Sequence, residues 1–254
     1  MTGPGAGFLD LAPRAAKPRA IGLTHVIDTG TPLPAFETLV EWLGDITDVW
    51  KFGWGTAYLD PAVRSKVDIL RRRGILACPG GTLLEVACLR GRADRFLSWA
   101  AEVGFTAIEV SNGATGMSGS DKRMLISQAS LHFHVLSEVG SKDPAVVLQP
   151  AAWEKEVRAD LGAGARWVVL EGRESGSVGL YDPQGRVKED VVERVTAAVG
   201  LERLVFEAPR KEQQAWFIRR FGPNVNMGNI SPDDALGLET LRLGLRADTI
   251  ALLR

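Results

Sequence analysis

Residues 105–140 read FTAIEVSNGATGMSGSDKRMLISQASLHFHVLSEVG, and this stretch contains the pattern that decides the fold. An apolar run over 105–113 predicts a β-strand, the amphipathic stretch 120–130 predicts a helix, and the run over 132–140 predicts the next strand. We count eight such strand and helix pairs along the chain. The strands are expected at 20–28, 46–53, 75–81, 105–113, 132–140, 165–174, 204–209 and 224–230, and the helices at 34–45, 60–73, 92–103, 120–130, 151–161, 188–199, 211–221 and 232–246.

Regular alternation of strands and helices predicts a parallel sheet, because parallel neighbours need a crossover connection between them. The first strand runs into Asp28-Thr29-Gly30 and not into the G-x-G-x-x-G turn that is typical of a nucleotide-binding open sheet. No break in composition divides the chain. We therefore predict the α/β class and a single (β/α)8 TIM barrel over residues 14–254, preceded by a flexible, Gly-rich N-terminal segment over residues 1–13.

Composition and charge exclude several classes of protein. The chain has 254 residues, 45% of them hydrophobic and 24% charged, with a formal net charge of -1. This balance is typical of a globular domain and gives no reason to expect nucleic acid or a membrane surface as a partner. Cys78 and Cys88 are too few for a disulfide framework and lack zinc-ligand spacing, so we expect reduced thiols in a cytoplasmic protein. The apolar runs are far shorter than the roughly 20 residues that span a bilayer.

Four consecutive predicted strands carry a glutamate near their C-terminal end. They are Glu109, Glu138, Glu171 and Glu207. Any one of them could be a solvated residue or half of a structural ion pair, but a barrel brings all four strand ends to one mouth, where active sites of this fold lie. Like charges so close repel unless a cation intervenes. Mg²⁺, which prefers oxygen ligands, is therefore the expected metal.

Cations and Gly-rich turns also lie at or just after the ends of predicted strands and would suit an anionic ligand. Lys51 and Arg173 lie at the ends of strands two and six, and Lys142 and Arg210 follow strands five and seven. Backbone N–H groups in Gly-rich turns can approach a phosphate or carboxylate closely. The candidate substrate-binding positions in such turns are Gly80, Gly81, Asn226 and Asn229. His25 lies inside the first predicted strand and is interpreted as a core residue.

Short motifs spread over residues 14–249 resemble the phosphosulfolactate synthase family. Lys-Phe-Gly-Trp-Gly-Thr and Glu-Gly-Arg-Glu-Ser-Gly, in this order, are specific. The motifs that carry the resemblance are Lys17-Pro18-Arg19, Gly22-Leu23-Thr24-His25-Val26, Lys51-Phe52-Gly53-Trp54-Gly55-Thr56, Gly80-Gly81-Thr82-Leu83, Ile108-Glu109-Val110-Ser111, Ser137-Glu138-Val139-Gly140, Glu171-Gly172-Arg173-Glu174-Ser175-Gly176, Phe206-Glu207-Ala208-Pro209, Asn224-Val225-Asn226 and the segment 238–249.

The resemblance implies a Mg²⁺-dependent barrel enzyme, a carbon–sulfur lyase, that adds sulfite to phosphoenolpyruvate and yields 2-phospho-3-sulfolactate. Its metal ligands would come from the four glutamates. Lys142 would be the proton donor, while Lys51, Arg173 and Arg210 would bind phosphate and sulfite. The chain differs from the usual family pattern at two places: Ser141 stands where a second lysine is often found, and Asn112 stands where Asp is commoner.

Two other functions are compatible with the sequence. Plant heat-stress proteins resemble the same family, so the chain could be a non-catalytic relative. Alternatively, a Mg²⁺-dependent lyase on this barrel could use another nucleophile or another enol phosphate. The expected partners are small anionic substrates, and homo-oligomers are common for such barrels. The product could serve coenzyme M biosynthesis or the production of sulfolactate for another use.

Overall fold

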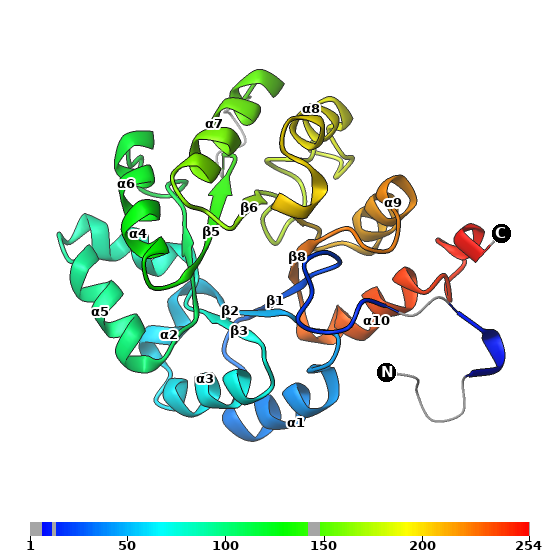
Figure 1. The fold of residues 1–254 in the computed structure, drawn as a ribbon, viewed down its shortest axis with the longest axis horizontal. Coiled ribbons are helices and arrows are strands. Elements are labelled where there is room, and N and C mark those ends of the chain that lie inside the picture. The colour runs from blue at the N-terminus through cyan, green and yellow to red at the C-terminus, as the bar shows by residue number, and fades with distance from the viewer. Residues whose placement is uncertain (1–6, 12–13, 142–147, 254) are drawn as a thin grey trace.

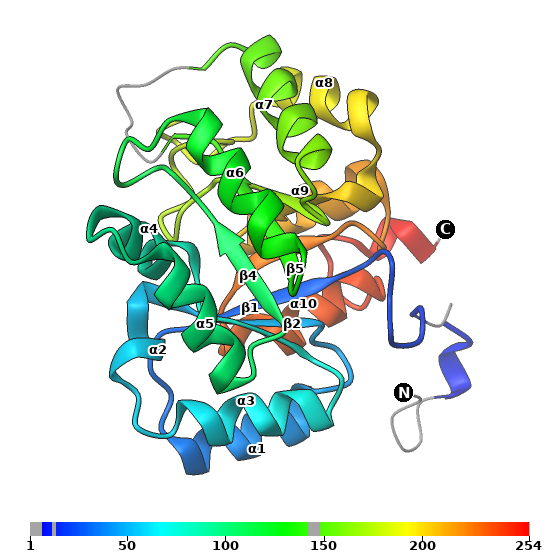
Figure 2. The ribbon, with the colours of Figure 1, turned by 60° about the vertical axis from the view of Figure 1, so that its left-hand side comes forward.

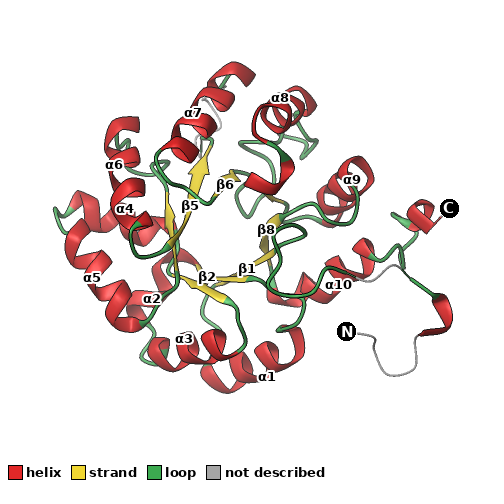
Figure 3. Cartoon of the chain, in the orientation of Figure 1, coloured by secondary structure: helices red, strands yellow, loops and turns green. Residues whose placement is uncertain are grey.

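Eight parallel strands form the centre of the fold, and helices surround them as a ring (Figures 1 and 3). The structure is a computed structural model that describes residues 7–11, 14–141 and 148–253. The hydrogen-bonded strand order is β3-β2-β1-β8-β7-β6-β5-β4. The ring closes between β3 and β4, where the amide of Thr106 donates to the carbonyl of Ala77 at 3.2 Å. The strands are β1 (Thr24–Asp28), β2 (Val49–Phe52), β3 (Leu76–Cys78), β4 (Ala107–Val110), β5 (His134–Val139), β6 (Trp167–Leu170), β7 (Leu204–Glu207) and β8 (Met227–Ile230).

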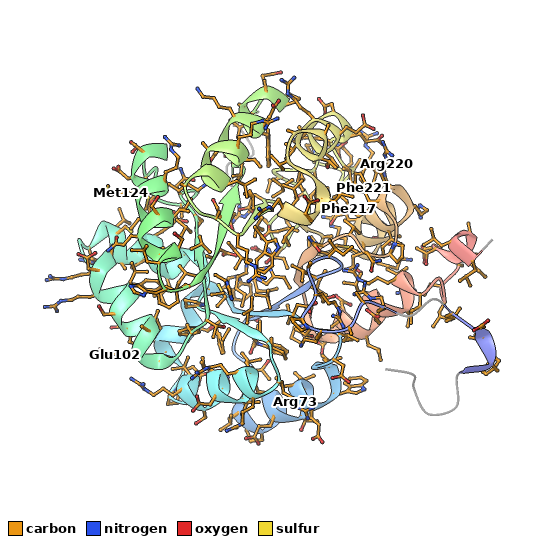
Figure 4. All side chains as sticks on the ribbon, viewed as in Figure 1. Arg73, Glu102, Met124, Phe217, Arg220 and Phe221 are labelled. Carbon is orange, nitrogen blue, oxygen red and sulfur yellow. The ribbon has the colours of Figure 1, made fainter. Side chains whose placement is uncertain are left out.

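The helices cover the outer face of the barrel on all sides (Figure 2). They are α1 (Leu33–Leu43), α2 (Thr56–Leu59), α3 (Val63–Arg72), α4 (Gly81–Leu89), α5 (Ala93–Val103), α6 (Gly119–Ser130), α7 (Pro150–Gly162), α8 (Glu189–Val199), α9 (Lys211–Phe221) and α10 (Pro232–Arg242). Their packing is exemplified by α9, where the rings of Phe217 and Phe221, labelled in Figure 4, stack on Phe206 of β7. The predicted (β/α)8 barrel is confirmed.

Two helices differ from the sequence prediction. Helix α4 occupies residues that the sequence assigned to a Gly-rich turn and a loop, because Gly81 is the first residue of the helix and the segment after it is apolar. Gly80, with φ of 78°, turns the chain from β3 into α4. The expected helix over 60–73 begins later, at Val63, and the short α2 precedes it. A glycine pair thus marks a helix start here.

Side chains alternate along each strand between the outer wall and the barrel interior. The lower interior is filled by small and apolar side chains, among them Ala107, Leu136 and Val205. Two residues further along the same strands, on the same inward face, lie Glu109, Glu138 and Glu207. The pleat therefore carries these carboxylates into the C-terminal mouth of the barrel, above an apolar floor.

A second set of buried charges closes the opposite, N-terminal face. Lys17 donates to the carbonyl of Thr47 at 2.6 Å, just before β2. Arg19 pairs with Asp48 at 3.0 Å, and Arg242 donates to the carbonyl of Val225 at 2.7 Å, just before β8. The Lys17-Pro18-Arg19 motif therefore serves the fold. Residues 1–6 and 12–13 of the expected N-terminal segment lie outside the described residues.

Two further expectations concern cysteines and membrane spans. Cys78 and Cys88 are both free thiols. Burial, together with the nearby Glu109 carboxylate, raises the pKa of Cys78 to about 12, so this thiol stays protonated and unreactive. Throughout the described part of the chain, no helix has the length and apolar character needed to cross a membrane.

Candidate active site

The four strand-end glutamates meet around one cavity of about 140 Å³ at the C-terminal mouth of the barrel. Their exposed fractions are 3% for Glu109, 6% for Glu138 and 1% each for Glu171 and Glu207. A wider hollow of about 820 Å³ between residues 88–95 and α6 contains none of the residues predicted for the site. The predicted residues that line the cavity are Lys51, Gly80, Gly81, Glu109, Glu138, Glu171, Arg173, Glu207 and Asn229.

Lys51 provides a buried cation in this ring of carboxylates. Its Nζ lies 3.0 Å from Glu109 Oε2 and 3.7 Å from Glu207 Oε1, and the residue is only 4% exposed. Burial by itself lowers the pKa of Lys51, but the charges of Glu109, Glu207 and Glu138 outweigh it and raise the pKa well above 10.5. Lys51 is therefore held in its charged form, in which it can attract an anion.

The turn after β6 wraps its backbone around two of the carboxylates. The amide of Gly172 donates to Glu207 Oε2 at 2.8 Å. The amide of Arg173 donates to Glu171 Oε1 at 2.7 Å and to Glu207 Oε2 at 3.0 Å. A Cβ on Gly172 would lie 2.6 Å from the Tyr181 ring, so only glycine allows this approach.

Burial raises the pKa of the Glu207 carboxyl group. Removal from water raises the pKa of this carboxyl, and repulsion from Glu138 and Glu109 adds to the effect, while Lys51 and the Gly172 amide oppose it. Among the described residues that line the cavity, carboxylates thus outnumber the two cations, Lys51 and Arg173. An added cation would relieve that repulsion.

Strained backbone conformations gather at the same cavity. In the described parts of the chain, the non-glycine residues with positive φ are Asp10, Trp54, Arg173 and Asn229. Three of these four, all but Asp10, line the cavity, each with a φ of 54°. Such conformations cost of order 1–3 kcal/mol each and cluster at functional sites, where the surrounding structure enforces them. Their clustering independently marks this cavity as the functional site.

Two lining residues show what the site offers a ligand. Asn229 is 8% exposed, and within the described segments its Oδ1 has no hydrogen-bond partner, which leaves a buried acceptor in the cavity. Trp54 is 65% exposed and forms part of the rim, although the sequence prediction did not include it. Its signals in the sequence are the glycines on either side, at the end of a predicted strand, and its place in the family motif Lys51-Phe52-Gly53-Trp54-Gly55-Thr56.

Two predicted site residues, Asn226 and Arg210, do not line the cavity. Asn226 precedes β8 at the opposite face, where its Oδ1 accepts from the Leu23 amide at 2.9 Å and its Nδ2 donates to the Leu204 carbonyl at 2.9 Å. Arg210 is the N-cap residue of α9 and does not line the cavity. Lys142, the expected proton donor, lies outside the described residues.

The position where the family pattern commonly has Asp also lies away from the cavity lining. Asn112 donates through Nδ2 to the carbonyl of Met117 at 3.0 Å, within the loop that follows β4. Its side chain thus stabilises this loop. A carboxylate at this position would not gain the same hydrogen bond.

The donor chemistry of the cavity fits Mg²⁺ with few protein ligands. Among residues 7–11, 14–141 and 148–253, no group of three or more His, Cys, Asp or Glu side chains has the arrangement of a metal site. Glu109 accepts from Lys51 and the Gly81 amide, Glu207 accepts from two backbone amides, and Glu171 accepts from the Arg173 amide. Mg²⁺ usually takes only one or two carboxylates and completes its shell with water and substrate oxygens. Glu138 on β5 and Glu171, the residue that follows β6, both line the cavity and carry carboxylate oxygens of the kind that such a site uses.

His25 occupies the barrel interior below this site without a polar partner. It is fully buried, and neither ring nitrogen has a hydrogen-bond partner in the part of the chain that the structure describes. Burial lowers the pKa of His25 well below 6.5, and the Lys51 charge lowers it further. The interpretation of His25 as a core residue agrees with its position. Its ring nitrogens lack hydrogen-bond partners among the described residues, so the imidazole is held in its neutral form.

We expect His25→Val to remove part of the acid sensitivity of folding. Below pH 6.5 the unfolded chain protonates His25 while the native state does not, so stability falls as the pH decreases through this value. By pH 5 the wild type should lose about 1–2 kcal/mol more of its free energy of unfolding than the variant. Urea unfolding at pH 5, 6 and 8 measures this difference, and parallel pH profiles would contradict it.

An eight-stranded barrel with buried carboxylates, a charged lysine and strained turns at its C-terminal mouth defines an enzyme of the (β/α)8 class that handles small anionic ligands. A family model described as (2R)-phospho-3-sulfolactate synthase (ComA) matches residues 12–248. The chain belongs to the phosphosulfolactate synthase family.

Individual relatives agree with this assignment. The chain is 43% identical over 244 residues to the phosphosulfolactate synthase of Methanothermobacter thermautotrophicus, covering 94% of this chain and 95% of that protein. It is 39% identical over 247 residues to that of Bacillus subtilis, covering 96% and 98%. Among solved structures, the YdjI aldolase from Escherichia coli K12 has a TM-score of 0.56 at 12% identity, covering 92% and 90%, which is a likeness of fold alone.

Proposed function

We propose that the protein catalyses the Mg²⁺-dependent addition of sulfite to phosphoenolpyruvate, which yields 2-phospho-3-sulfolactate. The observation that carries this proposal is the buried ring of four carboxylates around Lys51 in a barrel of this family. The substrates are two small anions. The two free thiols support a cytoplasmic location.

The reaction joins a sulfur nucleophile to an enol phosphate. The sulfur lone pair of sulfite forms a bond to C3 of phosphoenolpyruvate, and the C2–C3 π electrons move toward the carboxylate. A proton then adds to C2, and the phosphate ester stays intact. The carboxylate carries a second negative charge before protonation, and bound Mg²⁺ would supply the charge neutralisation for it.

Residues of the cavity have distinct proposed roles. Glu138 and Glu171 hold the metal ion, whereas Glu109 and Glu207 orient Lys51 and the turn at Arg173. Lys51 and Arg173 attract the anionic groups of the substrates. The turn at Gly80 and Gly81 lets backbone approach a phosphate or carboxylate, and Asn229 offers its amide to substrate. Lys142 is proposed to donate the proton to C2, while Lys51 stays charged beside Glu109 and Glu207.

The buried charges favour an enzyme over a non-catalytic relative. Burying carboxylates and a lysine costs folding free energy, and well-packed apolar side chains at these positions would usually be at least as stable. A barrel that only bound or protected other proteins would gain nothing from this arrangement. Destabilising charges held in a cavity by strained turns are typical of catalytic sites.

Metal removal and substrate omission test the proposed reaction. We expect ³¹P NMR of the purified protein with phosphoenolpyruvate, sulfite and Mg²⁺ to show a new phosphate-ester resonance. EDTA or omission of sulfite should abolish it. Loss with EDTA is expected because the cavity repels two anionic substrates without an added cation. An unchanged spectrum from folded protein would exclude the proposed reaction, and a product formed without Mg²⁺ would exclude the metal.

A further inference from the structure

The backbone carbonyl of Glu138 lies near the end of β5, next to the side chain that lines the cavity. The carbonyls of Val135 and Val139 accept from the β6 side, from the amides of Arg166 at 2.8 Å and Glu171 at 2.9 Å. The carbonyl of Glu138, an odd number of residues away from both, therefore faces β4. Strand β4 ends at Val110, which lies opposite Ser137. Like any buried carbonyl, this group needs a hydrogen-bond donor.

Lys122 of α6 supplies that donor from behind the barrel wall. Its Nζ donates to the Glu138 carbonyl at 2.6 Å, and the side chain is fully buried. Asp160 of α7 balances the charge at 2.7 Å, and Glu156 lies at 3.0 Å. Asp160 also accepts a hydrogen bond from Ser137 Oγ. The last polar residues of β5 are thus held by two helices that lie side by side over this strand (Figure 1).

Tight packing after Glu138 transmits the position of the strand end into the site. Gly140 has a φ of 130°, and a Cβ there would lie 2.6 Å from the Trp153 ring of α7 and 2.7 Å from the Cβ of Glu171. The chain therefore leaves β5 through a narrow gap beside a second cavity carboxylate. A shift of the backbone at Gly140, two residues after Glu138, brings it against Glu171 or Trp153.

From this geometry we infer that Lys122 is a positioning residue that sets the place of Glu138 in the carboxylate ring. Stability alone does not explain the cluster, because an apolar pair of similar volume is often as stable as a buried lysine and aspartate. The inference rests on the proposed function to the extent that Glu138 is placed there as a metal ligand. Its structural part, the fixed end of β5, is independent of the reaction.

The test compares variants that remove the donor without leaving a buried charge. Lys122→Met alone would strand Asp160, so the test variant is K122M combined with D160N, which keeps an acceptor for Ser137. Lys122→Arg retains the donor and the charge. The matched control is K66M with D60N, which removes another buried lysine–aspartate pair that contacts none of the four carboxylates.

Two readouts are expected to move together. In K122M/D160N, hydrogen exchange of the backbone over 134–141 should rise at least tenfold and kcat should fall at least tenfold, while K122R stays within threefold of wild type in both. The control pair should keep wild-type kcat and wild-type exchange over 134–141. Wild-type exchange and kcat in K122M/D160N, or an equal loss of kcat in the control, would overturn the inference. If the wild type itself converts no phosphoenolpyruvate, the proposed function fails, and the exchange data alone decide the role of Lys122.

Discussion

Lys51→Met is expected to lower kcat/KM for phosphoenolpyruvate by about 1000-fold or more, equivalent to about 4 kcal/mol of transition-state stabilisation. Lys51 is the buried cation that contacts both Glu109 and Glu207. Without it, Arg173 is the remaining cation among the described residues that line the cavity, and an incoming anion meets uncompensated carboxylates. Steady-state kinetics with saturating sulfite and Mg²⁺ measure the effect. Activity within tenfold of wild type would show that Lys51 does not contact the reacting anions.

The same substitution is expected to destabilise the fold, so a second variant separates the two effects. Removing one partner of a buried ion pair typically costs about 3–5 kcal/mol. In K51M combined with Glu109→Gln, one stranded charge is gone, and the Gln carbonyl can still accept from the Gly81 amide. This double variant should recover most of the lost stability and none of the activity. Recovery of both would mean that K51M acted through folding alone.

The stability deficit of K51M should depend on pH in a defined direction. Burial raises the pKa of Glu207, and loss of the opposing Lys51 charge raises it further. Above pH 4.5 the unfolded chain releases this proton while the native variant retains it, so stability falls as the pH rises. We therefore expect a smaller deficit at pH 5 than at pH 8. A deficit that grows toward acid pH would contradict the placement of Glu207 in the charge ring.

Much of the fold could be predicted because its signals are local. Parallel strands need crossover helices, so alternation of apolar runs and amphipathic stretches identified eight strands. Carboxylates at the C-terminal ends of these strands could be placed together because all eight ends meet at one mouth of a parallel barrel. The beginning of a strand is a weaker signal. Asn226 lies one residue before β8, so its side chain is at the N-terminal end of the barrel. Asn229, further along β8, is at the C-terminal mouth.

Contacts between distant strands could not be predicted. Nothing near Lys51 in the sequence indicates that its ammonium group lies between Glu109 and Glu207, and this contact holds Lys51 in its charged form. The backbone conformation of the turns could not be predicted from the sequence either. The glycine pair at Gly80 and Gly81 is compatible with a turn or with a helix start, and only packing of α4 on β4 selects the helix.

Arg173→Ala should cost about 2–4 kcal/mol of transition-state stabilisation, equivalent to a loss of kcat/KM of about 30-fold to 1000-fold. Arginine and alanine share the same penalty at a φ of 54°, and the backbone amide that holds Glu171 and Glu207 remains. The substitution therefore isolates the guanidinium group, which lines the cavity.

Comparison with two further variants distinguishes charge from hydrogen-bond geometry at Arg173. Arg173→Lys keeps the charge but loses the planar fork that binds phosphate or sulfite oxygens in pairs, so we expect it to recover only part of the activity. Arg186→Ala is the matched control, because its side chain is 78% exposed and pairs with Asp182 away from the cavity. It should retain wild-type kinetics. Activity of R173A within threefold of wild type would exclude a contact between Arg173 and either anionic substrate, since a charge-assisted hydrogen bond lost from a buried site costs more than that.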